Sequence, residues 1–585
     1  MLSTFKNVGL LALTAKVFAT NPHPCALAGP GFPSPSGLSN SSIFNESITE
    51  FEKSLSSAEL DLQANDTAWA VALFSSKENK TLYERYYTPP IDVGVSKVDS
   101  SSIFRIGSVS KVFCVWSFLI EVGDERFNDP ITKYIPELAN LTYNGGSDQE
   151  VYNDIDHVRW EEVTLSQLAS HAAGISRDPT YNDLAAELGP SQVSALGLPV
   201  LKTDEIPTCN TPGSSRICTR NELFSYLLNQ RPLYPTAHSP AYSNVAFTLL
   251  GYAQQAITGT PLSDAVTTNI FEALAMKNSS FSRKPSSGGV IPGGNESQVG
   301  WNEDLGPFSP SGAIYSSTAD LVKAGQAILQ SRLLSPAQTR RWMKPLTQTG
   351  YLSTAVGAPW EIRYLTLQDE RVSQIHTKQG DEGTYHTAFI LSPEHDLGWV
   401  VLAADATNTN AGRIRETLMN SFGDLFLPMA ELQAQNEAGV NFAGIFADEA
   451  TNSSVKIQTA PSGSPGLFVT GLTSHGAQVV GPESPLIQVY GVGQSARLYP
   501  SNLRATSRSK DGSGTYDSRL GFRAEFFNAS QPGKIQDPCL SAWTAVGAPT
   551  YGQVALDDWV FEMQENGQAE ALNVGFLRLR LKRVN

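Results

Sequence analysis

The sequence predicts an α/β (α+β) fold, in which one sheet is flanked by helices, followed by a C-terminal all-β domain. The first observation is that alternating, strand-like segments occur at both ends of a long region, at 69–74, 82–87, 360–367, 385–391 and 397–404. The second is that helical patterns lie between them. The third is that short strands and turns follow residue 440, typical of a sandwich or small barrel. We therefore expect one sheet built from both ends of this region, with a helical region inserted.

The segment Ser108-Val109-Ser110-Lys111 places a hydroxyl and an amine three residues apart at the start of an apolar helical pattern. Residues i and i+3 share a helix face, so the Lys111 amine can reach the Ser108 oxygen and accept its proton. The residues that follow are apolar on nearly every side, which predicts a helix buried in a large domain. Burial disfavours the ammonium and moves a lysine toward its proton-accepting form.

The same S-x-x-K spacing also occurs at Ser3, Ser453 and Ser507. Only Ser108 opens a helical pattern. The spacing alone leaves open a chance serine beside a lysine whose amine reaches solvent.

Tyr242-Ser243-Asn244 is the only Y-x-N in the chain, and it lies between a Pro-marked loop and an apolar run. A tyrosine there can relay protons, and an asparagine amide can accept from a lysine and donate to a substrate carbonyl. The alternatives are a loop tyrosine that packs its ring and an asparagine that caps a helix.

Lys378-Gln379-Gly380 falls among the predicted strands, whereas the other K-x-G matches, at Lys323 and Lys510, fall in a helical pattern and a Gly-rich loop. A strand lysine beside a glycine provides a positive charge with close backbone access. The backbone N–H groups of Ser108 and Asp381 could then form an oxyanion hole. The alternative is an edge-strand lysine that discourages aggregation.

Taken in order, these three segments resemble those of the serine beta-lactamase and penicillin-binding-protein superfamily, in its class C and esterase-like branch. The resemblance covers roughly residues 50–428. It includes the segments 104–107, 129–136, 168–175, 241–251 and 312–321. It implies a beta-lactamase/transpeptidase-like antiparallel sheet flanked by helices, with a helical subdomain, here in a secreted, fungal-type member carrying an added C-terminal β domain.

The resemblance also implies roles for individual residues. Ser108 would be the acylated nucleophile, Lys111 its proton acceptor and Tyr242 a partner in proton transfer. Asn244 and Lys378 would orient the substrate. His171 is expected to be structural, because the mechanism of the family leaves it no task.

One residue departs from the pattern of the family's antibiotic-cleaving members. Gln379 stands where those members usually carry a hydroxyl residue, between the lysine and Gly380. This departure favours an ester, lactone or amide substrate over a beta-lactam. We expect Gln379 and Gly380 to contact that substrate.

The chain has 585 residues, more than a domain with a single hydrophobic core usually contains, which predicts more than one domain. We expect a signal peptide at 1–19, a leader at 20–50, a catalytic domain at 51–428, a linker at 429–439 and an accessory β domain at 440–585.

The net charge is −15, from 42 basic and 57 acidic residues, and no basic cluster suggests a nucleic-acid partner. The apolar N-terminal run is too short to span a bilayer.

Cysteines and glycosylation sequons favour an extracellular location. Cys209 and Cys218 flank a short loop and are expected to form a disulfide; Cys25 and Cys539 would then pair, and Cys114 would remain a packed free thiol. Nine N-x-S/T sequons are glycosylation candidates. They are Asn40, Asn45, Asn65, Asn79, Asn140, Asn278, Asn295, Asn452 and Asn528.

The leading hypothesis is a secreted serine hydrolase that forms an acyl-enzyme at Ser108. A second is an acyltransferase of secondary metabolism using the same intermediate, and a third is an inactive binding or structural protein with this fold. The eight histidines show no H-x-H or H-E-x-x-H spacing, so no metal and no cofactor is expected. The expected partner is a small-molecule or peptide acyl substrate, and the sequence does not indicate an oligomeric state.

Overall fold

A computed structural model of the chain divides into two compact units, one of residues 34–367 and 372–434, the other of residues 1–33, 368–371 and 435–585. We describe each unit by itself. The structure describes residues 29–55, 62–139, 154–181, 183–211, 216–369, 371–460, 464–481, 484–486, 495–512, 514–526, 539 and 543–584. The predicted signal peptide, 1–19, and the first part of the leader lie outside these residues.

The first unit contains an eight-stranded antiparallel sheet whose strand order is β2-β1-β11-β10-β9-β8-β7-β6. The strands are β1 (Thr67–Ser75), β2 (Lys80–Tyr87), β6 (Thr347–Gln348), β7 (Thr354–Val356), β8 (Glu361–Thr366), β9 (Val372–Glu382), β10 (Tyr385–Ser392) and β11 (Leu397–Asp405). Strand β1 pairs with β11 along its whole length, from Thr67 opposite Asp405 to Ser75 opposite Leu397. The N-terminal hairpin therefore joins the strands around Lys378, as predicted.

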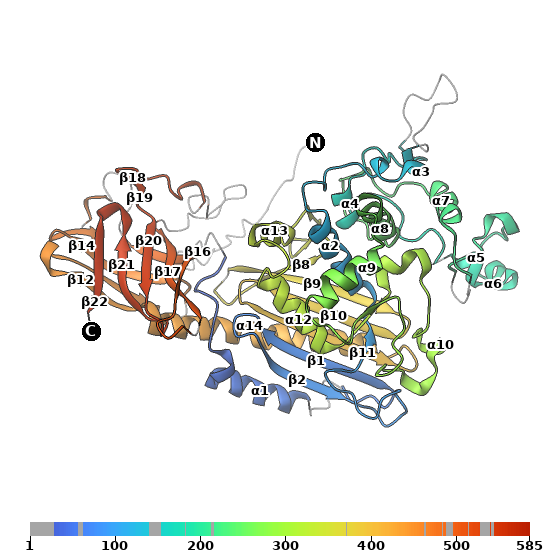
Figure 1. The fold of residues 1–585 in the computed structure, drawn as a ribbon, viewed down its shortest axis with the longest axis horizontal. Helices are drawn as coiled ribbons and strands as arrows, with labels where there is room; N and C mark the ends of the chain where they lie inside the picture. Colours follow the sequence, from blue (N-terminus) through green and yellow to red (C-terminus); the bar gives the residue numbers. More distant parts are fainter. Residues whose placement is uncertain are drawn as a thin grey trace, which may run out of the picture. The chain divides into compact units, whose positions relative to one another are not determined.

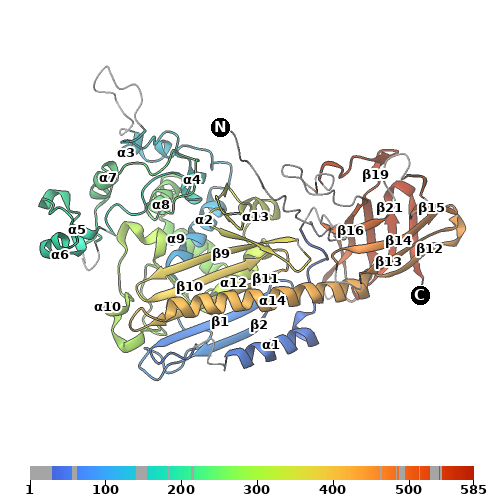
Figure 2. The same ribbon diagram turned by 180° about the vertical axis from the view of Figure 1, so that it is seen from behind.

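Helices cover both faces of this sheet, which is why its strands β1 and β11 are buried along their whole length (Figures 1 and 2). In β1 the even-numbered residues Ala70 and Phe74 belong to one hydrophobic cluster, together with residues of α2 (Ser110–Glu121) and α12 (Thr318–Leu329). The odd-numbered Val71 and Leu73 belong to a second cluster, with residues of α1 (Ser42–Leu55) and α14 (Ala411–Phe442). Alternate side chains of a strand point to opposite faces, so both faces are buried.

The regular elements described between β2 and β6 are mostly helices, as expected from the pattern. Its remaining helices are α3 (Pro136–Ala139), α4 (Leu165–Ala169), α5 (Leu184–Glu187), α6 (Pro190–Ala195), α7 (Arg220–Leu228), α8 (Val245–Thr258), α9 (Leu262–Val266), α10 (Glu296–Val299), α11 (Ser309–Gly312) and α13 (Pro336–Trp342). A small sheet of β3 (Phe104–Arg105), β5 (Ile314–Ser316) and β4 (Ser280–Phe281) leads into α2.

Helices cross both expected boundaries of the catalytic domain, at residues 50 and 428. Helix α1 begins at Ser42, within the expected leader, where the Ser41 hydroxyl accepts the backbone N–H of Phe44 at 3.3 Å. The expected linker at 429–439 is helical and belongs to α14, which runs through Pro428. The helix continues past this proline because Met429 and Ala430 are buried in its hydrophobic cluster.

The second unit contains an antiparallel sheet of nine strands in which β13 also pairs with β14, so the sheet closes into a barrel. Its strands are β12 (Gly444–Asp448), β13 (Ser453–Thr459), β14 (Leu467–Ser474), β15 (Ala477–Val480), β16 (Ala496–Arg508), β17 (Thr515–Glu525), β20 (Asp558–Met563), β21 (Ala569–Val574) and β22 (Leu579–Val584); a separate hairpin joins β18 (Thr550–Tyr551) to β19 (Val554–Ala555). Phe442, Phe446, Phe522 and Phe561 pack together, with ring centroids 5.0 to 5.8 Å apart. This unit is the predicted all-β region, in its barrel form.

The disulfide predicted between Cys209 and Cys218 is present, with Cα atoms 4.9 Å apart. Cys539 is also disulfide-bonded, and its predicted partner, Cys25, lies outside the described residues. Cys114 is a buried free cysteine, and burial raises the pKa of its thiol. These observations agree with the cysteine predictions wherever the structure describes the residues.

Six of the candidate sequon asparagines have exposed side chains, and Asn278 is half-buried. The exposed ones are Asn40, Asn45, Asn65, Asn79, Asn295 and Asn452. Asn140 and Asn528 lie outside the described residues.

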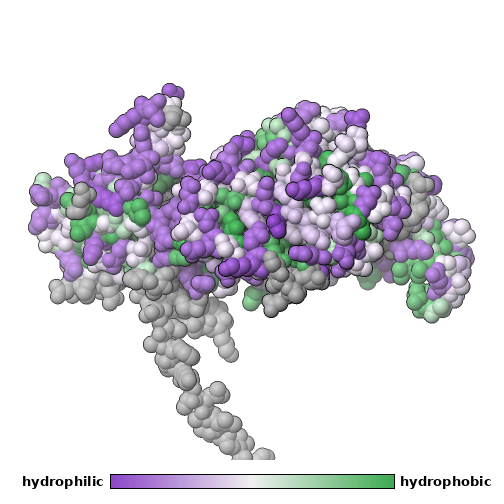
Figure 3. Space-filling view, turned by 90° about the horizontal axis from the view of Figure 1, so that it is seen from below, coloured by the Kyte–Doolittle hydropathy of each residue, from purple (hydrophilic) through white to green (hydrophobic). Residues whose placement is uncertain are grey.

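Hydrophilic residues predominate on the face of the molecule seen in Figure 3, and hydrophobic ones form only small groups there. Within the described ranges, no helix combines the length and apolar character that crossing a membrane requires.

Candidate active site

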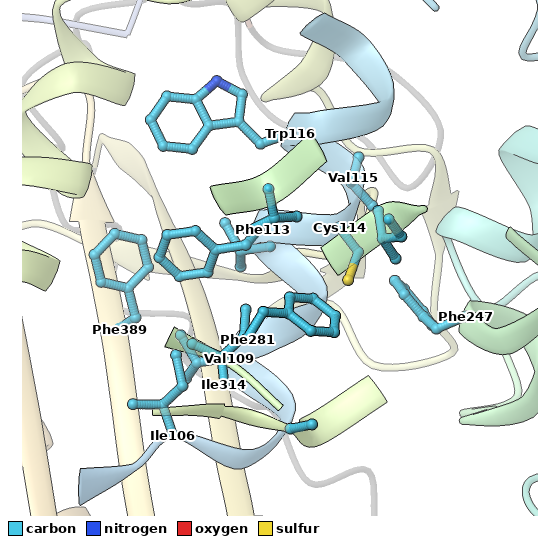
Figure 4. Packing of buried hydrophobic residues seen from close by; sticks show 14 of the residues in the cluster. Ile106, Val109, Phe113, Cys114, Val115, Trp116, Phe247, Phe281, Ile314 and Phe389 are labelled. Atoms are coloured by element: carbon cyan, nitrogen blue, oxygen red, sulfur yellow. The ribbon is translucent and has the colours of Figure 1, made fainter. Parts of the chain in front are cut away.

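Ser108 lies in a single 3-10 turn, Gly107–Val109, that leads directly into α2. Helix α2 is held in place by packing, since Val109, Phe113 and Trp116 are all buried (Figure 4). The hydroxyl of Ser110 accepts a hydrogen bond from the Ile314 N–H at 3.1 Å, which ties the start of the helix to β5. The sequence prediction of a serine at the start of a buried helix is therefore correct.

Lys111 has no exposed surface, and its Nζ has three oxygen neighbours. Ser108 Oγ is 2.9 Å away, Asn244 Oδ1 2.8 Å and the Ser311 carbonyl oxygen 2.7 Å. Burial, helped by the charge of Lys378, lowers the pKa of Lys111. A neutral amine could donate its two N–H bonds to Asn244 and Ser311, which directs the nitrogen lone pair at Ser108.

Tyr242 is the second group on the serine, and its hydroxyl donates to Ser108 Oγ at 2.7 Å. Burial acts to raise the pKa of this phenol, but the Nζ atoms of Lys111 and Lys378 lie 5.0 and 5.2 Å from the ring centroid. Their charge lowers the Tyr242 pKa to about 8. The phenol can therefore lose or regain a proton near neutral pH.

Lys378 is not an edge-strand lysine, because β9 pairs with β10 on one side and β8 on the other. Its side chain is 1% exposed, and its Nζ donates to Glu361 Oε1 at 2.6 Å and to the Gln379 carbonyl at 2.8 Å. Burial acts to lower the pKa of Lys378, and the Glu361 carboxylate overcomes this and raises it. Lys378 is thus a fixed positive charge beside Tyr242.

Glu361 was missed in the sequence analysis. It belongs to β8, and its second oxygen, Oε2, accepts the backbone N–H of Gln379 at 3.1 Å. The pairing of Glu361 with Thr377 brings this carboxylate beside Lys378. Strand register depends on the tertiary pairing, so the sequence offered no local signal for this contact.

Asn244 immediately precedes α8 but does not cap it through its side chain. The Ser243 hydroxyl accepts the Ala246 N–H instead, at 3.1 Å. The Asn244 amide oxygen faces Lys111, and its Nδ2 donates to Asp178 Oδ2 at 3.1 Å. Asp178, whose side chain is 3% exposed, was also missed; it fixes which end of the Asn244 amide faces the lysine.

The backbone around Ser108 lies directly against the backbone of Gly380 and Asp381. A Cβ added to Gly380 would lie 2.1 Å from the Ile106 carbonyl oxygen and 3.0 Å from the Ser108 nitrogen, and one added to Gly107 would lie 2.7 Å from the Asp381 nitrogen. Gly107 also has a φ of +48°. The two amide nitrogens predicted to form an oxyanion hole are therefore neighbours, and the two glycines make this approach possible.

Gln379 is half-buried beside this pair, and the side chain of Asp381 contacts Arg415 and His386, each at 2.6 Å. The structure thus brings together every residue predicted for catalysis and substrate binding.

No metal site was expected from the sequence. The described residues do contain one cluster of potential ligands, Glu394, His395 and Glu431. Both ring nitrogens of His395 already have partners there, Ser392 and Glu431.

A family model described as beta-lactamase matches residues 62–423. The chain belongs to the beta-lactamase family. A second model, described as "Beta-lactamase-like-like, C-terminal domain", matches residues 434–585. The homologous proteins are named as hydrolases and beta-lactamase-like proteins, which places the chain in the beta-lactamase-like serine hydrolase superfamily.

A beta-lactamase-like protein of Arthroderma benhamiae is 26% identical to this chain over 97% of both sequences. A probable hydrolase, M10, of a Phoma species is 25% identical over 77% of this chain and 73% of its own length. Among solved structures, a beta-lactamase/D-alanine carboxypeptidase from Yersinia pestis is 18% identical, covers 65% of this chain and 99% of its own, and has a TM-score of 0.44.

In this beta-lactamase-family site, we expect kcat/KM to decline with rising pH, and we expect this decline to begin at a lower pH in Glu361→Gln than in the unsubstituted protein. The Glu361 carboxylate raises the pKa of Lys378, so its removal lets Lys378 lose its proton at a lower pH. Loss of that charge also removes one of the two cations that favour the Tyr242 phenolate. A pH–rate profile with an activated ester measures this shift.

The control is Glu46→Gln, which removes an exposed carboxylate of α1. It should leave the profile unchanged. An unchanged alkaline limb in Glu361→Gln would contradict the influence of Glu361 on Lys378.

Proposed function

We propose that this protein is a secreted serine hydrolase that cleaves an ester, lactone or amide through an acyl-enzyme at Ser108. One observation carries the proposal: Ser108 Oγ lies 2.9 Å from the Lys111 amine and 2.7 Å from the Tyr242 hydroxyl. A serine oxygen needs a proton acceptor to attack a carbonyl, and here two titratable groups contact it.

In the proposed acylation step, Ser108 Oγ bonds to the substrate carbonyl carbon and its proton passes to Lys111. The carbonyl oxygen becomes an oxyanion, and the N–H groups of Ser108 and Asp381 stabilise it. The C–O or C–N bond then breaks, and the leaving group takes a proton from Tyr242, which regains one from Lys111. The products are the acyl-enzyme and a free alcohol or amine.

In the deacylation step, water attacks the acyl carbon and loses a proton to the same Lys111–Tyr242 pair. The ester bond to Ser108 breaks, and the proton returns to Ser108 Oγ. Lys378 stays charged next to Glu361. Its charge lowers the pKa of Tyr242, so the phenol can form a phenolate near neutral pH. Each group thus regains its initial protonation state once the acid product is released.

The proposed substrate class rests on the residues beside Lys378. Gln379 offers a carboxamide where the antibiotic-cleaving members carry a hydroxyl, and its backbone N–H is already bonded to Glu361. A carboxamide can hydrogen-bond to a neutral polar group through both its oxygen and its nitrogen. This supports an ester, lactone or amide substrate.

Export is part of the proposal, supported by the disulfide of Cys209 with Cys218 and by the exposed sequon asparagines. Mass measurement of the protein from culture medium, before and after enzymatic removal of N-glycans, tests it. Intracellular retention of unglycosylated protein would contradict it.

The test of the nucleophile is labelling with a fluorophosphonate probe, followed by peptide mapping. We expect a single adduct on Ser108 that is lost in Ser108→Ala. The matched control is Ser507→Ala, because Ser507 belongs to another S-x-x-K tetrapeptide but is exposed on β16. Labelling that persists in Ser108→Ala, or that is lost in Ser507→Ala, would refute the assignment.

A further inference from the structure

His171 lies shortly after α4, and the proposed mechanism gives it no role. Its backbone has a φ of +59°, in the left-handed region, which is strained for a histidine. Its side chain is buried. A strained conformation in the core persists only where surrounding contacts hold it, and His171 has several such contacts.

His171 forms hydrogen bonds with the residues on both sides of Tyr242. Its carbonyl oxygen accepts the Ala241 N–H at 2.7 Å, and its ring Nδ1 accepts the Ser243 N–H at 3.1 Å. The imidazole stacks on the phenol ring of Tyr242, with centroids 4.3 Å apart and planes inclined by 21°. Three separate contacts therefore fix Tyr242 through one residue.

The imidazole is uncharged. Because Nδ1 accepts a hydrogen bond, the ring proton lies on Nε2, which has no hydrogen-bond partner among the described residues. Burial and the neighbouring Lys111 and Lys378 hold the pKa of His171 far below its ordinary value.

The contacts also explain why the residue is a histidine. A phenylalanine could stack on Tyr242 but would leave the Ser243 N–H without its acceptor. An asparagine could accept that N–H but would lose the stacking. Histidine supplies both the stacking ring and the hydrogen-bond acceptor. Burying its Nε2–H without a hydrogen-bond partner costs free energy, which indicates that both contacts are needed.

We propose that His171 is a positioning residue for Tyr242, holding the phenol oxygen on Ser108 Oγ through ring stacking and the bond to Ser243. This role rests on the proposed function of Tyr242 in proton transfer. His171 itself does not exchange protons with the substrate.

A double-mutant cycle between His171→Asn and Tyr242→Phe tests the proposal. Asparagine tolerates the left-handed conformation, so the variant is compatible with the backbone at this position. We expect His171→Asn to slow acylation of Ser108 by the fluorophosphonate probe on the order of ten-fold, because the phenol oxygen is no longer held in place. In the Tyr242→Phe background the same change should alter the rate by less than about two-fold.

Equal fold-losses in the two backgrounds would overturn the proposal, because they would show that His171 acts independently of Tyr242. The control is His475→Asn, an exposed histidine that also has a positive φ, +49°. It should not change the acylation rate in either background. His171→Phe, which keeps the stacking ring, should also lose rate through Tyr242.

A second measurement requires no substitution at His171. In NMR spectra of the full-length protein, the His171 ring should remain neutral, with its proton on Nε2, from pH 5 to 9, because a charged ring could not accept the Ser243 N–H. A His171 that becomes charged in this range would overturn the proposal. Loss of the Ser108 adduct itself would instead refute the proposed function, so the two failures are distinguishable.

Discussion

Lys111→Met is expected to lower the rate of Ser108 acylation by about 10³-fold, because it removes the amine that accepts the serine proton. Lys111 lies 2.9 Å from Ser108 Oγ and has no exposed surface, so bulk water cannot take its place as the base. Methionine is similar in length and apolar, and it suits the surroundings of the buried stem.

The substitution should leave the fold intact. It leaves Asn244 Oδ1 and the Ser311 carbonyl without the Lys111 donor, and it also removes an amine that is costly to bury in its charged form. These effects oppose one another, so we expect the free energy of unfolding to change by no more than about 2 kcal/mol. Chemical denaturation measures this alongside the rate of probe labelling.

The matched control is Lys277→Met, at an exposed position, which should leave the rate unchanged. A Lys111→Met enzyme that retained a tenth or more of the acylation rate would show that another group accepts the serine proton. Tyr242 would then be the candidate, because its hydroxyl also contacts Ser108 Oγ.

Gly380→Ala is expected to lower kcat/KM by about 10²-fold or more, through displacement of the backbone at the candidate oxyanion hole. The added methyl group would lie 2.1 Å from the Ile106 carbonyl oxygen and 3.0 Å from the Ser108 nitrogen. Both neighbours are backbone atoms, so β9 or the turn at Ser108 must shift. A shift there separates the N–H groups of Ser108 and Asp381.

Gly350→Ala is the matched control, because a Cβ at Gly350 would meet no atom within 4 Å. Steady-state kinetics with an activated ester compare the two variants, and thermal unfolding shows whether each is folded. Full activity in Gly380→Ala would contradict the oxyanion-hole assignment.

The sequence could predict the elements that carry the site, because their signals are local. The spacing of Ser108 and Lys111 sets which side chains share a helix face, and the apolar run after them predicts a buried helix. The burial of α2 confirms this. The strands on either side of Lys378 were equally apparent from their alternation, and they are found as β8, β10 and β11.

The sequence could not predict contacts that depend on strand register and loop course. Glu361 reaches Lys378 only because Glu361 pairs opposite Thr377. Asp178 reaches Asn244 across a difference of 66 positions in the chain. Nothing local to either acidic residue distinguishes it from the many solvent-exposed carboxylates of an acidic chain.

His171 shows the same limit. Its segment was recognised by resemblance, and a structural role was expected. Its stacking on Tyr242 and its left-handed backbone became apparent only once the loop before α8 was folded against it.

By itself, then, the sequence predicted the fold class and the buried helix at Ser108, and its resemblance to the superfamily implied roles for Ser108, Lys111, Tyr242 and Lys378. The helix and the strands follow from short-range periodicity and spacing, which the local backbone geometry sets. Only the tertiary structure decided how the groups are oriented and charged. Distances of 2.6 to 3.1 Å between residues 17 to 134 positions apart in the chain determine which proton moves, and burial among opposing charges sets each pKa.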